Sequence, residues 1–589
     1  MAGRQVICGL KLTHDGAVAV IEDDRLVFSV EAEKIDNRPR HARLSDLSDV
    51  VHQLAAHGID PGDLDAVAVD GWVQSRGGRA AAEVIRPDGG RSVLDLAGYA
   101  VIGRPGERPD ALARFAGTGL ALAGRELGYA SFPHATGHAL AGYCTSPFAG
   151  RRPALVLVWD GGMPAVLYRF DPATGALSSL GTVLPIAGAL YPVFASQLAP
   201  FAVPAAQRRS YGALGDFAQL EALLPVSGKA MAYAGLDQPS EAAIAVMEEV
   251  TDRLLPVGVA GCFVWSQQVL RRLAPAGLSD ATLLASFQEH LGRRLRRGLR
   301  EGPAAGYAAA GEPLCLSGGC ALNIKWNAAI RAGGQFSEVW VPPFPNDAGS
   351  AIGAACAERV HRGGGSALTW SVFAGPAIRP GGAPPAGWSA RPCPVEELAG
   401  LLHREQEPVV VLAGRAELGP RALGHRSILA PATSTRIRDR LNAIKRREPY
   451  RPVAPACLVD RAPEVFDPGT PDPYMLFDHR VRPEWRDRVP AIVHADGSAR
   501  LQTVGPDHPL LFRLLTAYQA VSGLPLLCNT SANLPGRGFF PDPSSAIEWG
   551  GTRFVWCEGT LYQAAAAGAP ATAPATARAP AGAPGGGGR

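Results

Sequence analysis

The sequence predicts an α/β protein built from two large domains. The chain has 589 residues, which is more than a single hydrophobic core normally organises. A pattern of three short strands occurs twice in its first half, with helix-compatible stretches in between. A stretch rich in glycine, proline and alanine, residues 363–394, separates this half from a second series of strands and helices, and we predict a linker there.

Composition and charge narrow the class of protein. Hydrophobic residues make up 47% of the chain, charged residues 19%, and the formal net charge is +3 at pH 7. A balance this near neutral indicates neither a nucleic acid nor an anionic membrane as partner. No apolar run approaches the ~18 residues of a membrane span, and the N-terminus lacks a signal-peptide layout. The ten cysteines contain no CxxC pair, which is typical of free thiols, so we expect a cytoplasmic protein.

The repeated strand pattern predicts a duplicated α/β domain over residues 1–362. The first copy has strands predicted over residues 6–11, 17–21 and 26–30. The second copy follows roughly 150 residues later, with strands over residues 154–159, 165–168 and 176–180. Each copy has an Asp-Gly loop between its first two strands, at Asp15-Gly16 and at Asp160-Gly161. We expect the two loops to face each other across a nucleotide cleft; two unrelated hairpins are the alternative.

Two histidines four residues apart, His134 and His138, follow Pro133 in a helix-compatible run. Residues i and i+4 share a helix face, so both imidazoles can point at one ion. Asp160 follows an apolar strand, and Asp347 lies in the loop Pro-Asn-Asp-Ala-Gly-Ser. Two imidazoles and carboxylates with open positions suit Fe(II), Mn or Zn rather than Ca. We therefore predict a divalent metal site on these four residues; two histidines packed in a core are the alternative.

Glycines after a predicted strand mark a second candidate site. The strand Leu-Cys-Leu-Ser runs into Gly318 and Gly319, which let backbone N–H groups approach a phosphate or nucleoside closely. The pair Gly228-Lys229 lacks the rest of a phosphate-binding loop, and no GxxxxGK[ST] occurs in the chain. Lysines number only five, so a retained lysine points weakly to a task that needs a compact ammonium group. Chance remains the alternative for at least three of them.

The second predicted domain spans residues 395–562 and is rich in arginine near its start. Six cationic residues fall within about forty positions: Arg415, Arg421, Arg426, Lys445, Arg447 and Arg451. Such crowding is self-repulsive unless an anion fills the space, so we expect a phosphate-rich ligand. A basic surface that serves solubility is the alternative.

Two further segments of this half carry predictions. A strand predicted over residues 524–528 is followed by Asn529-Thr530-Ser531-Ala532-Asn533, whose hydroxyls and amides can orient a nucleotide or a carbonyl group. Residues 563–589 consist almost entirely of alanine, proline, glycine and threonine. This composition cannot form a packed core and predicts a disordered tail.

Taken together, these motifs resemble one known family. They occur in family order along nearly the whole chain: His14 to Ala17, His134 to His138, Trp159 to Gly162, Gly228 to Met231, Ser317 to Asn323, Asn346 to Gly349, Glu417 to Ser427, Lys445 to Pro455 and Asn529 to Asn533. The chain resembles the O-carbamoyltransferases of antibiotic biosynthesis, which act on tobramycin, cephem, novobiocin and ansamycin scaffolds. It departs from many relatives at His425, where they have asparagine.

The resemblance implies an N-terminal domain of the actin-like ATPase superfold, with duplicated βββαβα halves, as in tRNA threonylcarbamoyl-adenosine transferases. It implies a YrdC-like C-terminal domain, whose KxR and SxN motifs appear here as Lys445-Arg446-Arg447 and Ser531-Ala532-Asn533. It also implies that carbamoyl-adenylate forms from carbamoyl phosphate and ATP in the C-terminal domain. The carbamoyl group then passes to a hydroxyl in the N-terminal domain, where Fe(II) is bound.

The resemblance implies the metal ligands, and the chemistry of the side chains leads us to expect the other roles. The expected metal ligands are His134, His138, Asp160 and Asp347. The cations expected to neutralise the phosphates of carbamoyl phosphate and ATP are Lys445, Arg447, Arg421 and Arg451. The residues expected to hold the nucleotide or the carbamoyl group are Ser531, Asn533, Asn529, Gly318, Gly319, Asn323 and Lys229. His14 is the expected base for the acceptor hydroxyl, because an imidazole titrates near neutral pH.

The expected partner is a small-molecule natural product with a hydroxyl group. We expect no membrane or nucleic-acid partner, and a homodimer is left open. A tRNA threonylcarbamoyl transferase is the main alternative, but it needs a basic tRNA-binding face that the +3 charge does not indicate. A catalytically idle nucleotide-binding scaffold is another alternative. A sugar or acetate kinase on the same superfold is a third, and it would need neither the two histidines nor a second domain.

Overall fold

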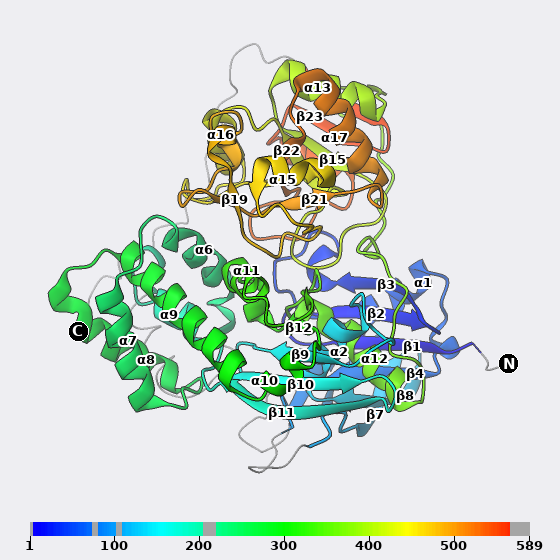
Figure 1. The fold of residues 1–589 in the computed structure, drawn as a ribbon. Helices are drawn as coiled ribbons and strands as arrows, with labels where there is room; N and C mark the ends of the chain where they lie inside the picture. The colour runs from blue at the N-terminus through cyan, green and yellow to red at the C-terminus, as the bar shows by residue number, and fades with distance from the viewer. Residues whose placement is uncertain (1–3, 73–79, 102–108, 204–219, 566–589) are drawn as a thin grey trace, which may run out of the picture.

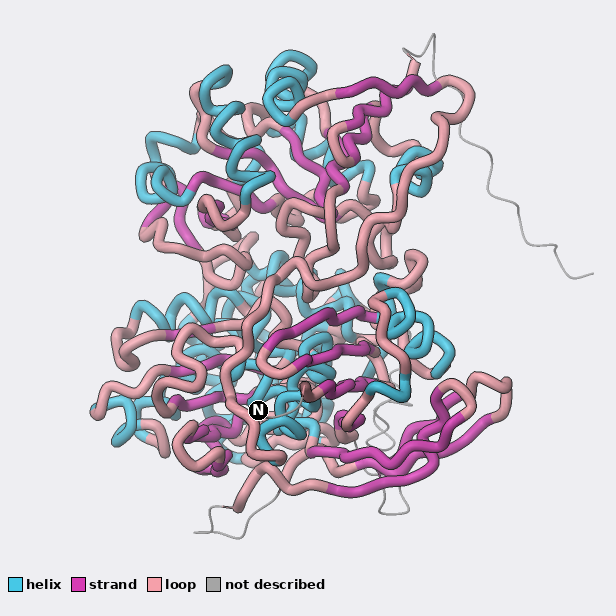
Figure 2. Tube along the Cα trace, turned by 90° about the vertical axis from the view of Figure 1, so that its right-hand side faces the viewer, coloured by secondary structure: helices cyan, strands magenta, loops and turns pink. Residues whose placement is uncertain are grey.

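The computed structural model describes residues 4–72, 80–101, 109–203 and 220–565. A C-terminal domain, residues 388–565, stacks on a broader N-terminal domain, residues 4–362 (Figures 1 and 2). The predicted disordered tail lies outside the described residues except for residues 563–565, where the last strand ends.

Two mixed sheets of the same plan form the N-terminal domain. The first has the order β3-β2-β1-β4-β8-β7 and the second the order β11-β10-β9-β12-β13. The strands of the first sheet are β1 (Val6–Lys11), β2 (Ala17–Glu22), β3 (Arg25–Glu31), β4 (Ala66–Asp70), β7 (Phe115–Leu122) and β8 (Arg125–Phe132). Those of the second are β9 (Ala154–Val158), β10 (Ala165–Asp171), β11 (Ala176–Leu184), β12 (Leu314–Ser317) and β13 (Val339–Trp340). A separate hairpin is formed by β5 (Ala80–Ile85) and β6 (Arg91–Leu96).

The strand pairing repeats between the two sheets. In each, three consecutive strands pair antiparallel, and the first of them also pairs in parallel with a later strand, β1 with β4 and β9 with β12. The pair β2–β3 and the pair β10–β11 both contain register shifts. This repetition confirms the predicted duplication of an α/β unit.

Two helices, α2 (His134–Cys144) and α12 (Ser350–His361), pack against each other between the sheets (Figure 1). Helix α12 lies against β1, β2 and β4, and helix α2 lies against β9 and β12. A Cβ atom at Gly353 of α12 would lie 1.8 Å from the carbonyl oxygen of Gly137 in α2, so only glycine permits this close backbone approach. Every residue of α2 is buried, which places the two predicted metal-binding histidines at the centre of the domain.

Among the described residues, the N-terminal domain has eight further helices. They are α1 (Leu47–Ala56), α3 (Leu190–Ala195), α6 (Leu224–Ala234), α7 (Glu241–Leu254), α8 (Gly261–Leu273), α9 (Asp280–Glu301), α10 (Ala305–Ala309) and α11 (Ile324–Ala332). Helix α9 contains the densest basic run of the chain and buries Leu291, Leu295 and Leu299 along one face. Its Arg293, about one third exposed, pairs with the exposed Glu241 of α7 at 2.6 Å, so this run forms a partly solvated helix face held by ion pairs.

The C-terminal domain is organised around a mixed sheet of order β14-β24-β23-β15-β16-β22-β17-β21. Its strands are β14 (Trp388–Pro392), β15 (Val409–Leu412), β16 (Arg426–Ala430), β17 (Ala454–Leu458), β21 (Gln502–Val504), β22 (Leu526–Ser531), β23 (Phe554–Cys557) and β24 (Thr560–Ala564). A small second sheet comprises β18 (Phe466–Asp467), β19 (His479–Val481) and β20 (Ser498–Ala499). The helices are α13 (Val395–Glu405), α14 (Thr435–Ile444), α15 (Ala462–Val465), α16 (Pro483–Arg486), α17 (Pro509–Ser522) and α18 (Pro543–Trp549).

Two details differ from the sequence predictions. Strand β14 lies inside residues 363–394, which were predicted as linker; this edge strand is mostly exposed and therefore has no alternating apolar pattern. Strand β22 continues through Asn529 and Thr530 to Ser531, which were predicted to follow the strand. These polar residues remain in the sheet because β16 pairs with them on one side.

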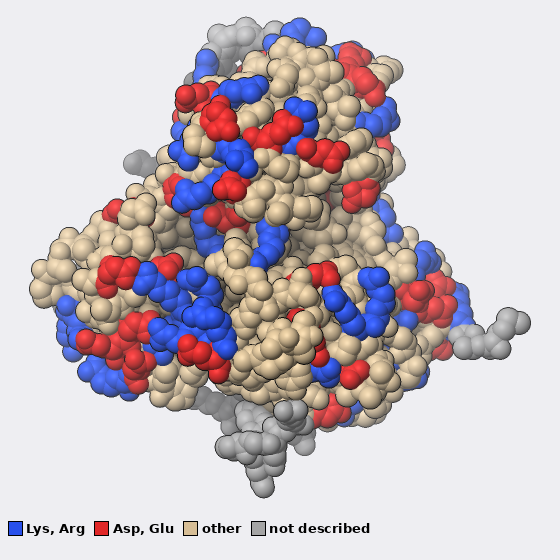
Figure 3. Space-filling model, in the orientation of Figure 1, with Lys and Arg blue, Asp and Glu red and all other residues tan. Residues whose placement is uncertain are grey.

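The cysteines and the surface charges of the structure can be compared with what the composition predicted. All ten cysteines, each among the described residues, are free thiols. No described helix is both long and apolar enough to cross a lipid bilayer. On the face drawn in Figure 3, Lys and Arg are interspersed with Asp and Glu.

Candidate active site

The four residues predicted to bind a metal lie together. His134 and His138 stand on α2, Asp160 follows β9, and Asp347 opens a short 3-10 turn, Asp347–Gly349, before α12. One ligand atom from each lies within 4.8 Å of all the others, and all four residues are buried. Oδ1 of Asp347 is 3.5 Å from Nε2 of His134 and 3.4 Å from Nε2 of His138. The structure thus brings the predicted set into one place.

The donor set and its supporting contacts fit a divalent ion. Nδ1 of His134 is 2.6 Å from Oδ2 of Asp70, which leaves Nε2 directed at the cluster, as in metal-bound histidines held by a carboxylate. Asp160 accepts a hydrogen bond from the Tyr99 hydroxyl and one of 2.6 Å from the Gly319 N–H. Ligands about 2.1 Å from an ion lie up to about 4.2 Å apart, so small side-chain movements would complete the site. Two imidazoles and two carboxylates suit Fe(II), Mn(II) or Zn(II).

Sequence reasoning missed the residues behind this cluster. The Lys11 ammonium lies 3.0 Å from Oδ2 of both Asp70 and Asp347, and 3.9 Å from the ring centroid of Trp72. Burial lowers the pKa of Lys11, but the attraction of Asp347 and Asp70 outweighs it and raises this pKa above the ordinary value. Asp70 is the last residue of β4, next to β1, so its position at a strand end was the available signal.

Asp70 is expected to set the metal affinity through His134, which gives a direct prediction. Asp70→Asn removes the charge that orients this imidazole, so the affinity for Fe(II) or Zn(II) should fall about 10- to 100-fold. Metal bound at equilibrium can be measured by elemental analysis after dialysis against a competing chelator. Glu358→Gln is the control, because this buried carboxylate pairs with Arg114 and Arg362 instead. Equal metal retention by the two variants would disprove a role for Asp70.

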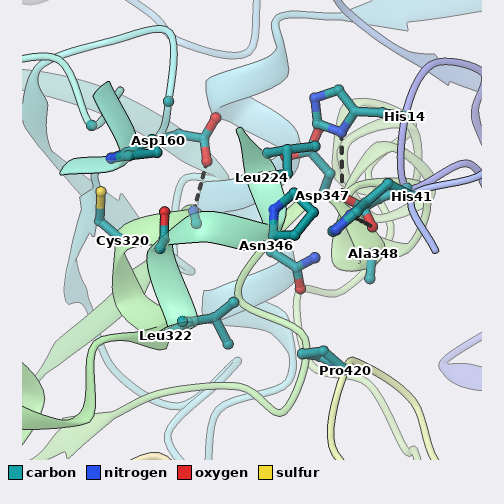
Figure 4. Close-up of a pocket in the computed structure, with 18 of the residues that line it drawn as sticks. His14, His41, Asp160, Leu224, Cys320, Leu322, Asn346, Asp347, Ala348 and Pro420 are labelled. Carbon is teal, nitrogen blue, oxygen red and sulfur yellow. Dashed lines mark hydrogen bonds and ion pairs between the residues drawn. The ribbon is translucent and has the colours of Figure 1, made fainter. Parts of the chain in front are cut away.

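The predicted base, His14, lies at the edge of the metal cluster. Its Nδ1 is 3.2 Å from Oδ2 of Asp15 and 3.7 Å from Oδ2 of Asp347. Burial lowers the pKa of His14, but Asp347 and Asp15 outweigh burial and raise it. Figure 4 shows His14 and Asp347 together on one side of the cavity, and Asp160 across from them.

The cationic residues of the C-terminal domain also form a cluster. Burial, then Arg40, Arg451 and Arg447, lowers the pKa of Arg421 to about 10. Burial and repulsion by neighbouring arginines lower the pKa of Arg447 to about 9.

The sequence analysis missed two members of this cluster, Arg500 and, from the N-terminal domain, Arg40. Burial and Arg421 hold the pKa of Arg500 well below its usual value. Within the described chain, the Nε–H groups of Arg421 and Arg500 are buried and find no acceptor. Unpaired cations gathered in this way fit an anionic ligand.

The predicted KxR and SxN motifs meet at the end of β22. The Lys445 ammonium donates to the carbonyl oxygens of Ser531 and Asn533, at 2.7 Å each, and to Oδ1 of Asn533. Ser531 donates to the same Oδ1 at 2.6 Å, and Arg447 donates to the Thr530 hydroxyl at 3.1 Å. Protein acceptors engage its hydrogens, so Lys445 anchors this loop. Burial, then Arg447, Arg40 and Arg451, lowers the pKa of Lys445 well below its usual value.

Asn529 stabilises the loop next to Arg421 through hydrogen bonds of its side chain. Its amide donates to Oε1 of Gln502 at 2.8 Å and to the carbonyl oxygen of Ala422 at 3.1 Å. These bonds hold the loop that carries Arg421, so the amide N–H groups are engaged within the protein.

One cavity of about 290 Å³ connects the two clusters. Its lining includes His14, Asp160 and Asp347 from the N-terminal domain, and Arg421 and Arg451 from the C-terminal domain. In Figure 4, Pro420 of the C-terminal domain lies on the side of the cavity opposite His14 and Asp160. A molecule in this space can contact both sites.

Of the other residues predicted to bind the nucleotide, some line the cavity and one does not. Gly319 and Asn323 line the cavity, and Asn323 also caps helix α11 by accepting from the Trp326 N–H at 3.3 Å. Gly318 has φ +87°, and a Cβ there would lie 2.4 Å from the Trp159 carbonyl oxygen. Lys229 is not among the described lining residues; its ammonium pairs with Glu448 at 2.7 Å.

Comparisons with known proteins find relatives that match this chain over nearly its whole length. The chain is 45% identical over 583 residues to nodulation protein U of Rhizobium tropici, covering 94% of this chain and 96% of that protein. It is 33% identical to 3'-hydroxymethylcephem-O-carbamoyltransferase of Streptomyces clavuligerus, covering 92% and 96% respectively. Among solved structures, the activator of 2-hydroxyisocaproyl-CoA dehydratase from Clostridium difficile matches with 14% identity and a TM-score of 0.29, over 61% of this chain and 97% of that one.

The comparisons broaden the resemblance seen in the sequence, because nodulation proteins are more similar to this chain than the antibiotic-biosynthesis enzyme named above. Residues 6–356 match the family described as carbamoyltransferase N-terminus, and residues 399–554 match the family described as carbamoyltransferase C-terminus. The first match contains His134, His138, Asp160 and Asp347, which we call the metal-ligand cluster. The second contains Arg421, Arg447, Arg451 and Arg500, which together with Arg40 we call the arginine cluster. The chain is therefore an enzyme that belongs to the carbamoyltransferase family.

Proposed function

We propose that this enzyme is an O-carbamoyltransferase with two successive reactions. It makes carbamoyl-adenylate from carbamoyl phosphate and ATP at the arginine cluster, and it transfers the carbamoyl group to an acceptor hydroxyl beside the metal-ligand cluster. The observation that carries this proposal is the single cavity lined by Asp160 and Asp347 on one side and by Arg421 and Arg451 on the other. The relative named as acting on the hydroxymethyl group of a cephem supports a small hydroxyl compound as acceptor.

The first reaction suits the cationic side of the cavity. Water would cleave carbamoyl phosphate into carbamate and phosphate, and a carbamate oxygen would attack the α-phosphorus of ATP with loss of pyrophosphate. Every reactant and product of this reaction except water is anionic, so stabilisation by fixed cations is the main catalytic requirement. Arg421, Arg447, Arg451 and Arg500 would supply that charge. Ser531 would hold the carbamate through its hydroxyl oxygen, with Asn533 fixing the position of that hydroxyl by accepting its hydrogen.

The second reaction suits the opposite side. The acceptor oxygen would attack the carbamoyl carbon, and AMP would leave. His14 would accept the hydroxyl proton at Nε2, because its Nδ1 is engaged by Asp15, which orients the ring. A divalent ion bound by the four ligands would supply positive charge for the phosphate of the adenylate. Because the adenylate reacts with water, a cavity shared by both sites also protects it during transfer.

The proposal includes finer assignments of fold, metal and domain limits. They are an actin-like ATPase superfold for residues 1–362, a YrdC-like fold for residues 395–562, and Fe(II) as the ion. The repeated βββαβα order of the two N-terminal sheets supports the first of these. The proximity of the KxR and SxN motifs supports the second, and the two-histidine, two-aspartate donor set supports the third.

Separation of the two reactions tests the assignment of His14. His14→Asn should leave ATP- and carbamoyl phosphate-dependent pyrophosphate release within a few-fold of wild type and reduce acceptor carbamoylation about 100- to 10,000-fold. Pyrophosphate can be measured with a coupled assay, and carbamoylated product by mass spectrometry with Fe(II) and a panel of polyhydroxylated compounds. Loss of both activities would refute this division of labour. Wild-type enzyme that releases no pyrophosphate would refute the adenylate route itself.

A further inference from the structure

Each of the five lysines of this chain lies at one of the two clusters or at a contact between the two domains. Lys11 lies behind the metal-ligand cluster, and Lys445 lies in the arginine cluster. The other three, Lys34, Lys229 and Lys325, belong to the N-terminal domain and contact residues of the C-terminal domain. We propose that these three lysines position the arginine cluster, so that the anion-binding site is complete only when the domains are docked.

Lys325 holds the segment that leads to Arg500. Its ammonium, on helix α11, lies 2.8 Å from Oδ2 of Asp478, 2.5 Å from Oδ2 of Asp496 and 2.9 Å from the Ser498 hydroxyl. Asp496 and Ser498 precede Arg500 by only a few residues, so their placement determines where this buried guanidinium lies.

The neighbouring contacts of α11 reinforce this docking. Nδ2 of Asn327 donates to the Leu476 carbonyl oxygen at 2.9 Å, and the Arg331 guanidinium lies 3.5 Å from the ring centroid of Phe477. Leu476 and Phe477 pack into the hydrophobic core of the N-terminal domain although they belong to the C-terminal one. Helix α11 is therefore a fixed reference for the segment that Lys325 binds.

Lys34 holds the loop that leads to Arg421. Its ammonium is buried and donates to the carbonyl oxygens of Glu417 at 2.5 Å and Gly419 at 2.9 Å. The Gly419 N–H in turn donates to Oε1 of Glu31 at 2.7 Å, so two residues of the N-terminal domain bind the backbone of Gly419 from both of its sides. Arg421 follows two residues later.

Lys229 acts on the charge of the cluster. It pairs with Glu448 at 2.7 Å, and Glu448 also lies 3.8 Å from Arg451, within the segment that contains Arg447. Without Lys229, this carboxylate would be free to turn toward Arg451 and neutralise it. Both partners of the pair are about one third exposed, so we expect a smaller effect here than at Lys34 or Lys325.

The physical reason for such anchors is the repulsion within the cluster. Burial first, and then neighbouring arginines, lower the pKa values of Arg421, Arg447 and Arg500, which means that their charged forms are disfavoured before an anion binds. Loops that carry mutually repelling charges separate unless other contacts hold them. The lysine contacts supply that restraint from outside the cluster. The inference rests on the proposed function for the identity of the anion, the phosphates of ATP.

Binding of inorganic pyrophosphate tests this role without requiring turnover. Titration calorimetry on the full chain should show weaker pyrophosphate binding by Lys325→Met, by about 10- to 100-fold, because small displacements of binding groups have effects of this size. Lys325→Arg should restore part of the affinity. Lys34→Met is the second variant, with the same expected loss. In steady-state assays, the KM for ATP should rise more than kcat falls.

Arg379→Met is the matched control. Arg379 pairs with Asp36 of the N-terminal domain at 2.7 Å and with Asp542 of the C-terminal domain at 3.0 Å. Arg379 and Asp36 are both more than half exposed, so this pair is too solvated to fix the position of Arg40 four residues along. This variant should bind pyrophosphate within about twofold of wild type, and its melting temperature serves as the reference for loss of one interdomain ion pair. If Lys325→Met and Lys34→Met bind pyrophosphate as Arg379→Met does, the inference is wrong. Wild-type enzyme that binds pyrophosphate but does not release it from ATP would instead overturn the proposed function and leave this inference standing.

Discussion

Arg421→Met is expected to reduce pyrophosphate release from ATP and carbamoyl phosphate about 100- to 1,000-fold, the loss typical of one removed charge-stabilising donor. The same substitution should raise the melting temperature. Arg421 is held against Arg40, Arg447 and Arg451 with its pKa lowered to about 10, first by burial and then by these neighbours. A methionine of similar length removes the repulsion and fills the space. Activity and stability should therefore move in opposite directions, as at sites where charge is gathered for function.

The control for this prediction is Arg440→Met on helix α14. Arg440 is half exposed and pairs with Glu407 at 2.9 Å, away from the cluster. It should leave both pyrophosphate release and melting temperature nearly unchanged. Retained activity in Arg421→Met, or a melting temperature that falls, would show that this arginine serves the fold rather than the anion.

His138→Ala is expected to have the second large effect, on transfer alone. The variant should bind less than a tenth of the metal bound by wild type and lose acceptor carbamoylation about a thousandfold, because the charge that the ion supplies is worth several kcal/mol. Pyrophosphate release should persist, since the arginine cluster is untouched. Metal content, product formation and pyrophosphate release can be measured on the same preparation.

His290→Ala separates this effect from the loss of a buried ring. His290 is also fully buried in the N-terminal domain, but it lies on α9, where its Nδ1 is 3.1 Å from Glu248. The cavity left by either substitution should lower the melting temperature, and only His138→Ala should lose metal. Equal metal content in the two variants would exclude His138 as a ligand.

Much of the strand and helix pattern could be predicted from the sequence because it depends on local signals. The predicted strand at residues 6–11 matches β1, and the helix expected after Pro133 begins at His134. Apolar runs bounded by Asp-Gly turns determine the first case, and proline in the first turn determines the second. The metal ligands could be assembled from distant segments because Asp160 and Asp347 stand at junctions of loops with regular elements, and because His134 and His138 are four residues apart on one helix.

The residues that sequence reasoning missed depend on tertiary contacts. Asp70 and Lys11 gain their roles only because β4 pairs with β1 behind the histidines. Arg500 and Arg40 join the arginine cluster from segments far from the predicted basic stretch, and no local pattern distinguishes them from other surface arginines. The role of Lys325 likewise depends on the docking of two domains.

The central claim is that the carbamoyl group is activated at the arginine cluster and transferred at the metal-ligand cluster. Rapid-quench analysis with radiolabelled carbamoyl phosphate and ATP tests it most directly, by following label in carbamoyl-adenylate and in product. His138→Ala should accumulate labelled carbamoyl-adenylate and form no product, whereas Arg421→Met should form neither. Loss of labelled adenylate in both variants, or transfer of label to product without any adenylate in the wild-type enzyme, would contradict the assignment of the two reactions to two sites.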